Sequence, residues 1–145
     1  MSDRAGTVAR YPQLLHTVID TPDPRALAEF YRLLLGLRYR PGDEPAADGG
    51  AGEERDWLVL TAADGSRKLA FQRVGQLRRT TWPAEDVPMQ MHLDLTVPDL
   101  EELRLQRQRA ESLGAQVLFD RTSDPDEPLF VFADPSGHPF CIFVA

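Results

Sequence analysis

The hydrophobic pattern of the chain predicts two strand–helix units in the same order. Residues 14–19 form a short apolar and β-branched run, which is typical of a strand. Residues 89–97 alternate between apolar and polar side chains, so one face of a second strand carries Gln90, His92, Asp94 and Thr96. Apolar residues at helical spacing follow each run: Leu27, Phe30, Tyr31 and Leu34 in the first unit, and Leu100, Leu103, Ala110 and Leu113 in the second.

Capping residues mark the ends of both predicted helices. Asp23 stands at the N-cap position, and Pro24 follows at the first helical position, where its missing N–H costs nothing. Asp99, with Glu102 three residues later, resembles a capping box. A glycine then ends each helix, since glycine readily adopts the left-handed conformation of a C-terminal cap; these are Gly36 and Gly114.

Three further strand-like segments follow each helix. They are 37–40, 57–61 and 69–74 in the first half, and 115–120, 129–133 and 140–144 in the second. The sequence therefore predicts an α+β fold of two tandem βαβββ modules, residues 12–74 and 89–144, joined by a connector over 75–88 within one domain spanning 1–145. An internal repeat supports this division: His16, Pro22 and Asp23 match His92, Pro98 and Asp99 at one constant offset of 76 residues.

Composition excludes several classes of protein. The net charge of −7 argues against nucleic-acid binding, which needs clustered basic residues. The longest apolar runs are far shorter than a membrane span, and residues 1–6 show no apolar stretch of a secretory signal, so we expect a cytoplasmic protein without membrane partners. Cys141 is the single cysteine, which excludes an internal disulfide.

Three segments carry a resemblance to a known group of proteins: Leu69–Val74, Met91–Leu95 and, most specifically, Ala133–Cys141. Together with the repeated βαβββ pattern, they resemble the vicinal-oxygen-chelate superfamily, which includes glyoxalase I, extradiol dioxygenases and bleomycin-resistance proteins. Within it, they are most similar to the glyoxalase-like branch. The resemblance implies that each module curls into half of a cup-like, barrel-like mixed sheet, that the helices pack outside, and that the chain forms a homodimer.

The resemblance also implies four positions for metal ligands, on the first and fourth strands of each module. In this chain they hold His16, Gln72, His92 and Cys141. Glyoxalase I has a glutamate where Gln72 and Cys141 stand, so both expected carboxylates are missing. Asp94 is the nearest acid and shares a strand face with His92. These departures argue against glyoxalase I chemistry, which needs a metal and a carboxylate that moves a proton.

Two interpretations of these residues stay open. His16 and His92 are candidate ligands for a divalent metal such as zinc, iron, manganese or nickel. Alternatively, the histidines are hydrogen-bonded groups that line a metal-free pocket, and Cys141 is a small buried residue. Trp57, on a strand at the end of a long loop, could face either the helices or the cleft.

Other polar and aromatic residues have structural interpretations. His138 lies in a predicted turn before the last strand, where we expect a surface residue. Trp82 is expected to fix the connector, and the alternative is that it covers a bound ligand. Arg73, Arg78 and Arg79 could attract an anion, although solvated surface is the default for each.

The expected function is binding of a small molecule in the cleft between the modules, without glyoxalase I chemistry. The cleft residues would be His16, Trp57, Gln72, His92, Asp94 and Cys141. The alternative is a metal-dependent lyase, isomerase or dioxygenase that uses His16 and His92.

Overall fold

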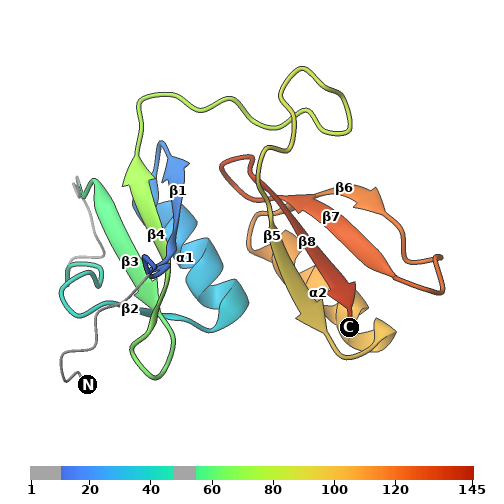
Figure 1. The fold of residues 1–145 in the computed structure, drawn as a ribbon, viewed down its shortest axis with the longest axis horizontal. Coiled ribbons are helices and arrows are strands. Elements are labelled where there is room, and N and C mark those ends of the chain that lie inside the picture. Colours follow the sequence, from blue (N-terminus) through green and yellow to red (C-terminus); the bar gives the residue numbers. More distant parts are fainter. Residues whose placement is uncertain (1–10, 48–54) are drawn as a thin grey trace.

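A computed structural model describes residues 11–47 and 55–145 and contains both predicted modules (Figure 1). The first module consists of β1 (Thr17–Thr21), α1 (Pro24–Leu35), β2 (Arg38–Tyr39), β3 (Trp57–Thr61) and β4 (Arg67–Arg73). The second consists of β5 (Leu93–Val97), α2 (Leu100–Ser112), β6 (Gln116–Asp120), β7 (Leu129–Ala133) and β8 (Pro139–Val144). The α+β class and the repeated βαβββ order are confirmed.

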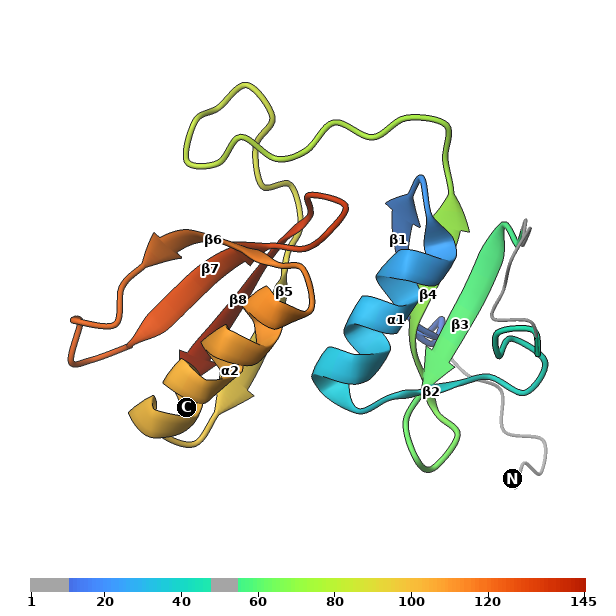
Figure 2. The same ribbon diagram turned by 180° about the vertical axis from the view of Figure 1, so that it is seen from behind.

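Each module forms a four-stranded mixed sheet with the same strand order. The orders are β1-β4-β3-β2 and β5-β8-β7-β6. The pairs β1–β4 and β5–β8 are parallel, and the remaining pairs are antiparallel. The two sheets are not closed into a barrel. Seen from behind, α1 and α2 lie in front of the sheets, so both helices cover the same side of the molecule and leave the opposite faces free of helices (Figure 2).

The edge strands β1 and β5 stand at the junction of the two modules. β1 points up and β5 points down in Figure 1, so these neighbouring edges run in opposite directions. The start of β1 and the start of β5 therefore lie at opposite ends of this junction. Matching residues at these two starts are kept apart. This arrangement decides which predicted site residues come together.

The predicted caps form except at the end of α2, where the C-cap is Leu113 rather than Gly114, and two predicted strand starts are wrong. The Asp23 side chain accepts a hydrogen bond from the Ala26 N–H, and Gly36 adopts a left-handed φ of 70°. The first strand begins at Thr17 rather than at residue 14, and β5 begins at Leu93 rather than at residue 89. In both cases the parallel partner strand begins its pairing only at that point, so the preceding apolar residues have no strand beside them.

One hydrophobic core runs through both modules. The aromatic ring of Phe140 on β8 stacks on Phe132 with centroids 4.9 Å apart and also contacts Phe30 and Tyr31 of α1. Tyr31 in turn stacks on Phe71 of β4. Helix α1 therefore packs against both sheets, and burial of these large rings fixes the modules to each other.

The turn between β7 and β8, residues 134–138, docks onto the first module through three hydrogen bonds. The buried Tyr31 hydroxyl donates to Asp134 at 2.7 Å. The hydroxyls of Thr21 and Ser136 are 2.8 Å apart, and His138 Nε2 lies 2.6 Å from the Asp20 carbonyl oxygen. Because buried polar groups need partners, these contacts set the spacing and orientation of the two modules.

The connector lies on the same turn. The Arg79 guanidinium donates to the Pro135 carbonyl at 3.0 Å, and the Thr80 N–H donates to the Gly137 carbonyl at 3.1 Å. Gly137 has a φ of 96°, and a Cβ atom at this position would lie 2.6 Å from the Arg79 side chain. Glycine is therefore required here both by its backbone conformation and by the close approach of the connector.

Within the described residues, neither helix has the length and apolar character that crossing a membrane requires.

Candidate functional site

A pocket of about 550 Å³ lies between the modules. Residues 17–20 of β1 line one side, and residues 90–93 together with 137–139 line the other. The connector contributes Leu77, Arg78, Thr80 and Val87. The pocket is thus built at the junction of β1 and β5, and the docked turn described above forms part of its wall.

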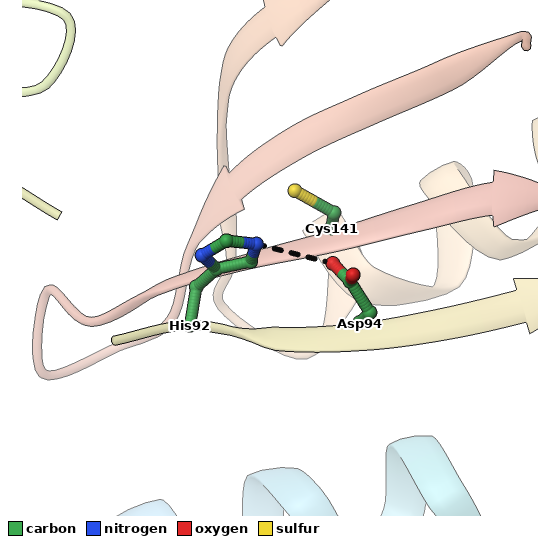
Figure 3. Close-up of side chains that lie close together, drawn as sticks. All are labelled: His92, Asp94 and Cys141. Carbon is green, nitrogen blue, oxygen red and sulfur yellow. Dashed lines mark ion pairs between the residues drawn. The ribbon is translucent and has the colours of Figure 1, made fainter. Parts of the chain in front are cut away.

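His92, Asp94 and Cys141 form a compact cluster beside this pocket, on the helix-free face of the second sheet (Figure 3). Their ligand atoms all lie within 4.8 Å of one another. The cluster follows from strand geometry: His92 and Asp94 are two residues apart along the chain, and Asp94 pairs with Cys141 in the parallel β5–β8 register. His92 also lines the pocket, so the cluster and the pocket share one residue.

The groups of this cluster have distinct states. His92 Nε2 lies 3.2 Å from Asp94 Oδ1, close enough for an ion pair when the imidazole is protonated. Burial, followed by the negative charge of Asp94, raises the pKa of the Cys141 thiol to about 11. Cys141 is therefore a neutral thiol at physiological pH rather than an activated nucleophile.

The cluster fits a borderline divalent metal. It offers one imidazole nitrogen, one carboxylate oxygen and one sulfur within 4.8 Å of one another, and all three are donor types that a zinc-type ion binds. Three protein ligands leave a coordination position for water or substrate, as catalytic metal sites do. The raised thiol pKa means that a metal must displace the Cys141 proton, so binding would weaken as the pH falls.

His16 lies in the first module and is not part of this cluster. Its ring centroid is 5.9 Å from that of Trp57, and its Nδ1 is buried without a hydrogen-bond partner among the described residues. Burial lowers the pKa of His16, and the nearby Arg67 and Arg40 lower it further. His16 is thus favoured in its neutral form.

Gln72 and Trp57 are opposite each other in the β3–β4 register on the first sheet. Gln72 is exposed and Trp57 is half-buried. The structure therefore brings together three of the predicted site residues, His92, Asp94 and Cys141, and places the other three in the first module. The separation of His16 from His92 follows from the opposite directions of β1 and β5.

Two charged pocket residues and one histidine were not among the predicted site residues: Asp20, Arg78 and His138. His138 was interpreted as a turn residue, and the turn is confirmed, but docking of that turn brings its ring to the pocket. Asp20 could have been predicted from the sequence, because strand alternation places it on the same face as His16. The position of Arg78 depends on the path of the connector, which no local pattern specifies.

Comparisons with known proteins agree with this fold. The family model of the glyoxalase-like domain matches residues 16–143. Since this range is nearly the whole chain, the protein belongs to the glyoxalase-like family, and its fold is that of the vicinal-oxygen-chelate superfamily. Among curated protein sequences, none matches the chain.

Solved structures share the fold at low sequence identity. A glyoxalase/bleomycin resistance protein/dioxygenase family enzyme from Burkholderia phytofirmans PsJN is 18% identical, with a TM-score of 0.62 over 90% of this chain and 96% of that chain. The fosfomycin resistance protein FosX from Mesorhizobium loti is 12% identical, with a TM-score of 0.63 over 93% of both chains. FosX from Listeria monocytogenes, in complex with Mn(II) and sulfate, is 14% identical, with a TM-score of 0.62 over 93% of both chains.

Proposed function

We propose that this protein binds a small molecule in the pocket between its two modules and does not carry out glyoxalase I chemistry. The observation that carries this proposal is the pocket of about 550 Å³ at the junction of β1 and β5. This volume lies within the range of roughly 300–1,000 Å³ that is usual for small-molecule sites. The wall combines apolar side chains with a few polar groups, the combination that binds a compact organic ligand.

Gln72 and Cys141 stand where glyoxalase I has glutamate, and both residues support ligand binding over glyoxalase I catalysis. Gln72 offers a neutral amide, which neither carries a negative charge to a metal nor accepts a proton as a general base. Cys141 holds a thiol whose pKa is raised to about 11, so it is a poor proton acceptor at neutral pH. Neither side chain can replace the glutamate that this chemistry requires.

Thermal-shift and NMR screening of the metal-free protein against metabolites and antibiotics tests the proposal. Val87 lines the pocket, so Val87→Trp should fill it and abolish binding of any hit. Leu105→Trp, on the exposed surface of α2, is the matched control and should retain binding. If the metal-free protein binds no compound, or if Val87→Trp and Leu105→Trp bind a hit equally well, the pocket is not the binding site.

The His92–Asp94–Cys141 cluster favours a second candidate function, that of a metal-dependent lyase, isomerase or dioxygenase. A divalent ion held there would supply a Lewis acid to a substrate oxygen. His92 would connect the ion to the pocket, because it belongs to both. Asp94 would bind the same ion through a carboxylate oxygen and bring a negative charge to it.

Metal analysis and Co(II) substitution test this second candidate. We expect one ion per chain and, with Co(II), the near-ultraviolet charge-transfer band of a cobalt–thiolate bond. His92→Ala should abolish binding, and Cys141→Ser should abolish the band. His16→Ala tests the predicted pairing of His16 with His92: if binding weakens equally in both variants, His16 is a ligand as well. Absence of stoichiometric metal after growth with added metals counts against this function.

We further infer that the chain forms a homodimer in the cytoplasm. Val18 of β1 and Met91 before β5 both line the pocket, and they are exposed at 42% and 78% of their surface. Exposed apolar residues on neighbouring segments favour association. Light scattering of the purified protein should give twice the mass of the chain, and Val18→Asp should shift the mass towards the monomer.

A further inference from the structure

His138 presents a free ring nitrogen to the pocket. Its Nε2 lies 2.6 Å from the Asp20 carbonyl oxygen, and a carbonyl can only accept a hydrogen bond. In the neutral imidazole the proton is therefore on Nε2, which leaves Nδ1 as an acceptor. No described residue forms a hydrogen bond with this Nδ1. This atom is also not among the buried polar side-chain atoms of the described residues that lack a partner. His138 lines the pocket, so this acceptor is open to a ligand.

Two charged residues of the same pocket, Arg78 and Asp20, are exposed to solvent. The Arg78 guanidinium and the Asp20 carboxylate make no hydrogen bond or ion pair with any other described residue. Neighbouring arginines differ. Arg79 donates to the Pro135 carbonyl, and Arg73 forms an ion pair with Asp56 at 2.9 Å. Arg78 is therefore the connector cation left available to a bound molecule.

The contacts around the docked turn bring these three groups to one region. The Asp20 carbonyl bonds to the His138 ring, which places Asp20 beside the turn. The Thr80 N–H bonds to the Gly137 carbonyl, which places Arg78, two residues earlier in the connector, beside the same turn. The pocket thus combines one cation, one anion and one neutral acceptor with an apolar wall that includes Leu77, Val87 and Leu93.

From this combination we propose that the ligand is a small zwitterion on an apolar body, of the α-amino acid class. Its carboxylate pairs with Arg78, and its ammonium group donates to the Asp20 carboxylate and to His138 Nδ1. Its apolar part contacts the aliphatic wall. Water solvates both exposed charges in the free protein, and a zwitterion is the ligand that can form an ion pair with each of them. This inference rests on the proposed function, because it assigns a ligand class to the same pocket.

Three matched ligands test the assignment by removing one charge at a time. L-Phenylalanine carries both groups, phenylalaninamide lacks the carboxylate, and 3-phenylpropionate lacks the ammonium group. The same three-way set built on leucine provides a shorter apolar body. Titration calorimetry and ¹⁵N NMR of the whole protein should show that the zwitterion of at least one set binds roughly tenfold or more tightly than both of its analogues, as charge-assisted hydrogen bonds predict.

Variants assign each charge to its residue. Arg78→Gln should weaken phenylalanine binding roughly tenfold and leave phenylalaninamide unchanged, while Asp20→Asn should weaken both of these ligands but not 3-phenylpropionate. Arg38→Gln on β2 and Asp126→Asn in the loop before β7 make the same charge changes outside the pocket and should have no effect.

His138→Gln separates ligand binding from docking of the turn. Glutamine keeps an N–H donor for the Asp20 carbonyl but lacks Nδ1, so phenylalanine binding should fall while the free energy of unfolding stays near that of the wild type. Side-chain ¹⁵N shifts of the free protein should show His138 protonated on Nε2.

Several outcomes would overturn the assignment. These are equal binding of the zwitterion and its analogues in both sets, no effect of Arg78→Gln relative to Arg38→Gln, or a proton on Nδ1 of His138. If uncharged compounds bind at the pocket while every zwitterion fails, the ligand class is wrong and the proposed function stands. If no compound of any class binds, the proposed function fails as well.

Discussion

Tyr31 and Asp134 are separated by 103 positions in the sequence and share a 2.7 Å hydrogen bond in the interior. Both residues have no exposed surface, and they belong to different modules. Asp134 also accepts hydrogen bonds from the backbone N–H groups of Ser136 and His138. This one carboxylate therefore shapes the turn that carries His138 and ties the turn to α1.

We expect Tyr31→Phe to lower the free energy of unfolding by about 1–3 kcal/mol, because it removes a donor from a buried carboxylate. Tyr39→Phe is the matched control. The Tyr39 hydroxyl donates to Glu29, which is only partly buried and also pairs with Arg32, so the loss should be smaller, about 1 kcal/mol or less. Urea denaturation measures both. If both variants lost the same free energy of unfolding, the buried Tyr31–Asp134 hydrogen bond would contribute no more to stability than the partly buried Tyr39–Glu29 bond.

The Asp134 carboxyl should make stability depend on pH. Burial raises its folded-state pKa above the usual value of 3.8, although the hydrogen bond from Tyr31 opposes this shift. The native state therefore binds more protons than the unfolded state, and the contribution of Asp134 to stability falls as the pH rises from 3.8 through the raised pKa. We expect the stability of the wild type relative to Asp134→Asn to be greatest in acid and to decrease across this window. Urea denaturation between pH 3.5 and 7 measures it, and a difference that grows with pH would contradict this account.

We expect Gly137→Ala to destabilise the protein more than Gly65→Ala. Both glycines have a positive φ, 96° and 87°, so both substitutions cost about 1–2 kcal/mol in backbone strain. Only at Gly137 would the new methyl group meet Arg79, which should add about 1–3 kcal/mol for overpacking. Denaturant unfolding of the two variants isolates this contact. If both variants lost the same free energy of unfolding, the connector would move away from the new methyl group at Gly137 without loss of stability.

We expect Cys141 to react slowly with iodoacetamide in the native protein. A thiol pKa of about 11 leaves roughly a hundredfold less thiolate at pH 7 than a pKa of 9 would. The rate should rise about tenfold per pH unit up to that value, and Asp94→Asn should increase it because a negative charge is removed. The urea-unfolded protein is the control. A native rate that equals the unfolded rate would contradict the raised pKa.

The sequence alone determined the repeated architecture. Local signals were sufficient because each is set by neighbouring residues: Asp23 and Gly36 cap α1, and strict alternation places His92 and Asp94 on one strand face. The ends of strands were less certain, because β1 and β5 begin where their parallel partners begin to pair, and that register is a long-range property.

Tertiary structure alone decided which groups meet at the site. The constant offset of 76 residues matches His16 with His92, but β1 and β5 run in opposite directions at the junction, and the first module supplies Asp20 rather than His16 to the pocket. His138 becomes a pocket residue only because Tyr31 and Asp134 hold its turn against the other module. Contacts between residues more than 100 positions apart arise from packing, and no periodicity along the chain specifies them.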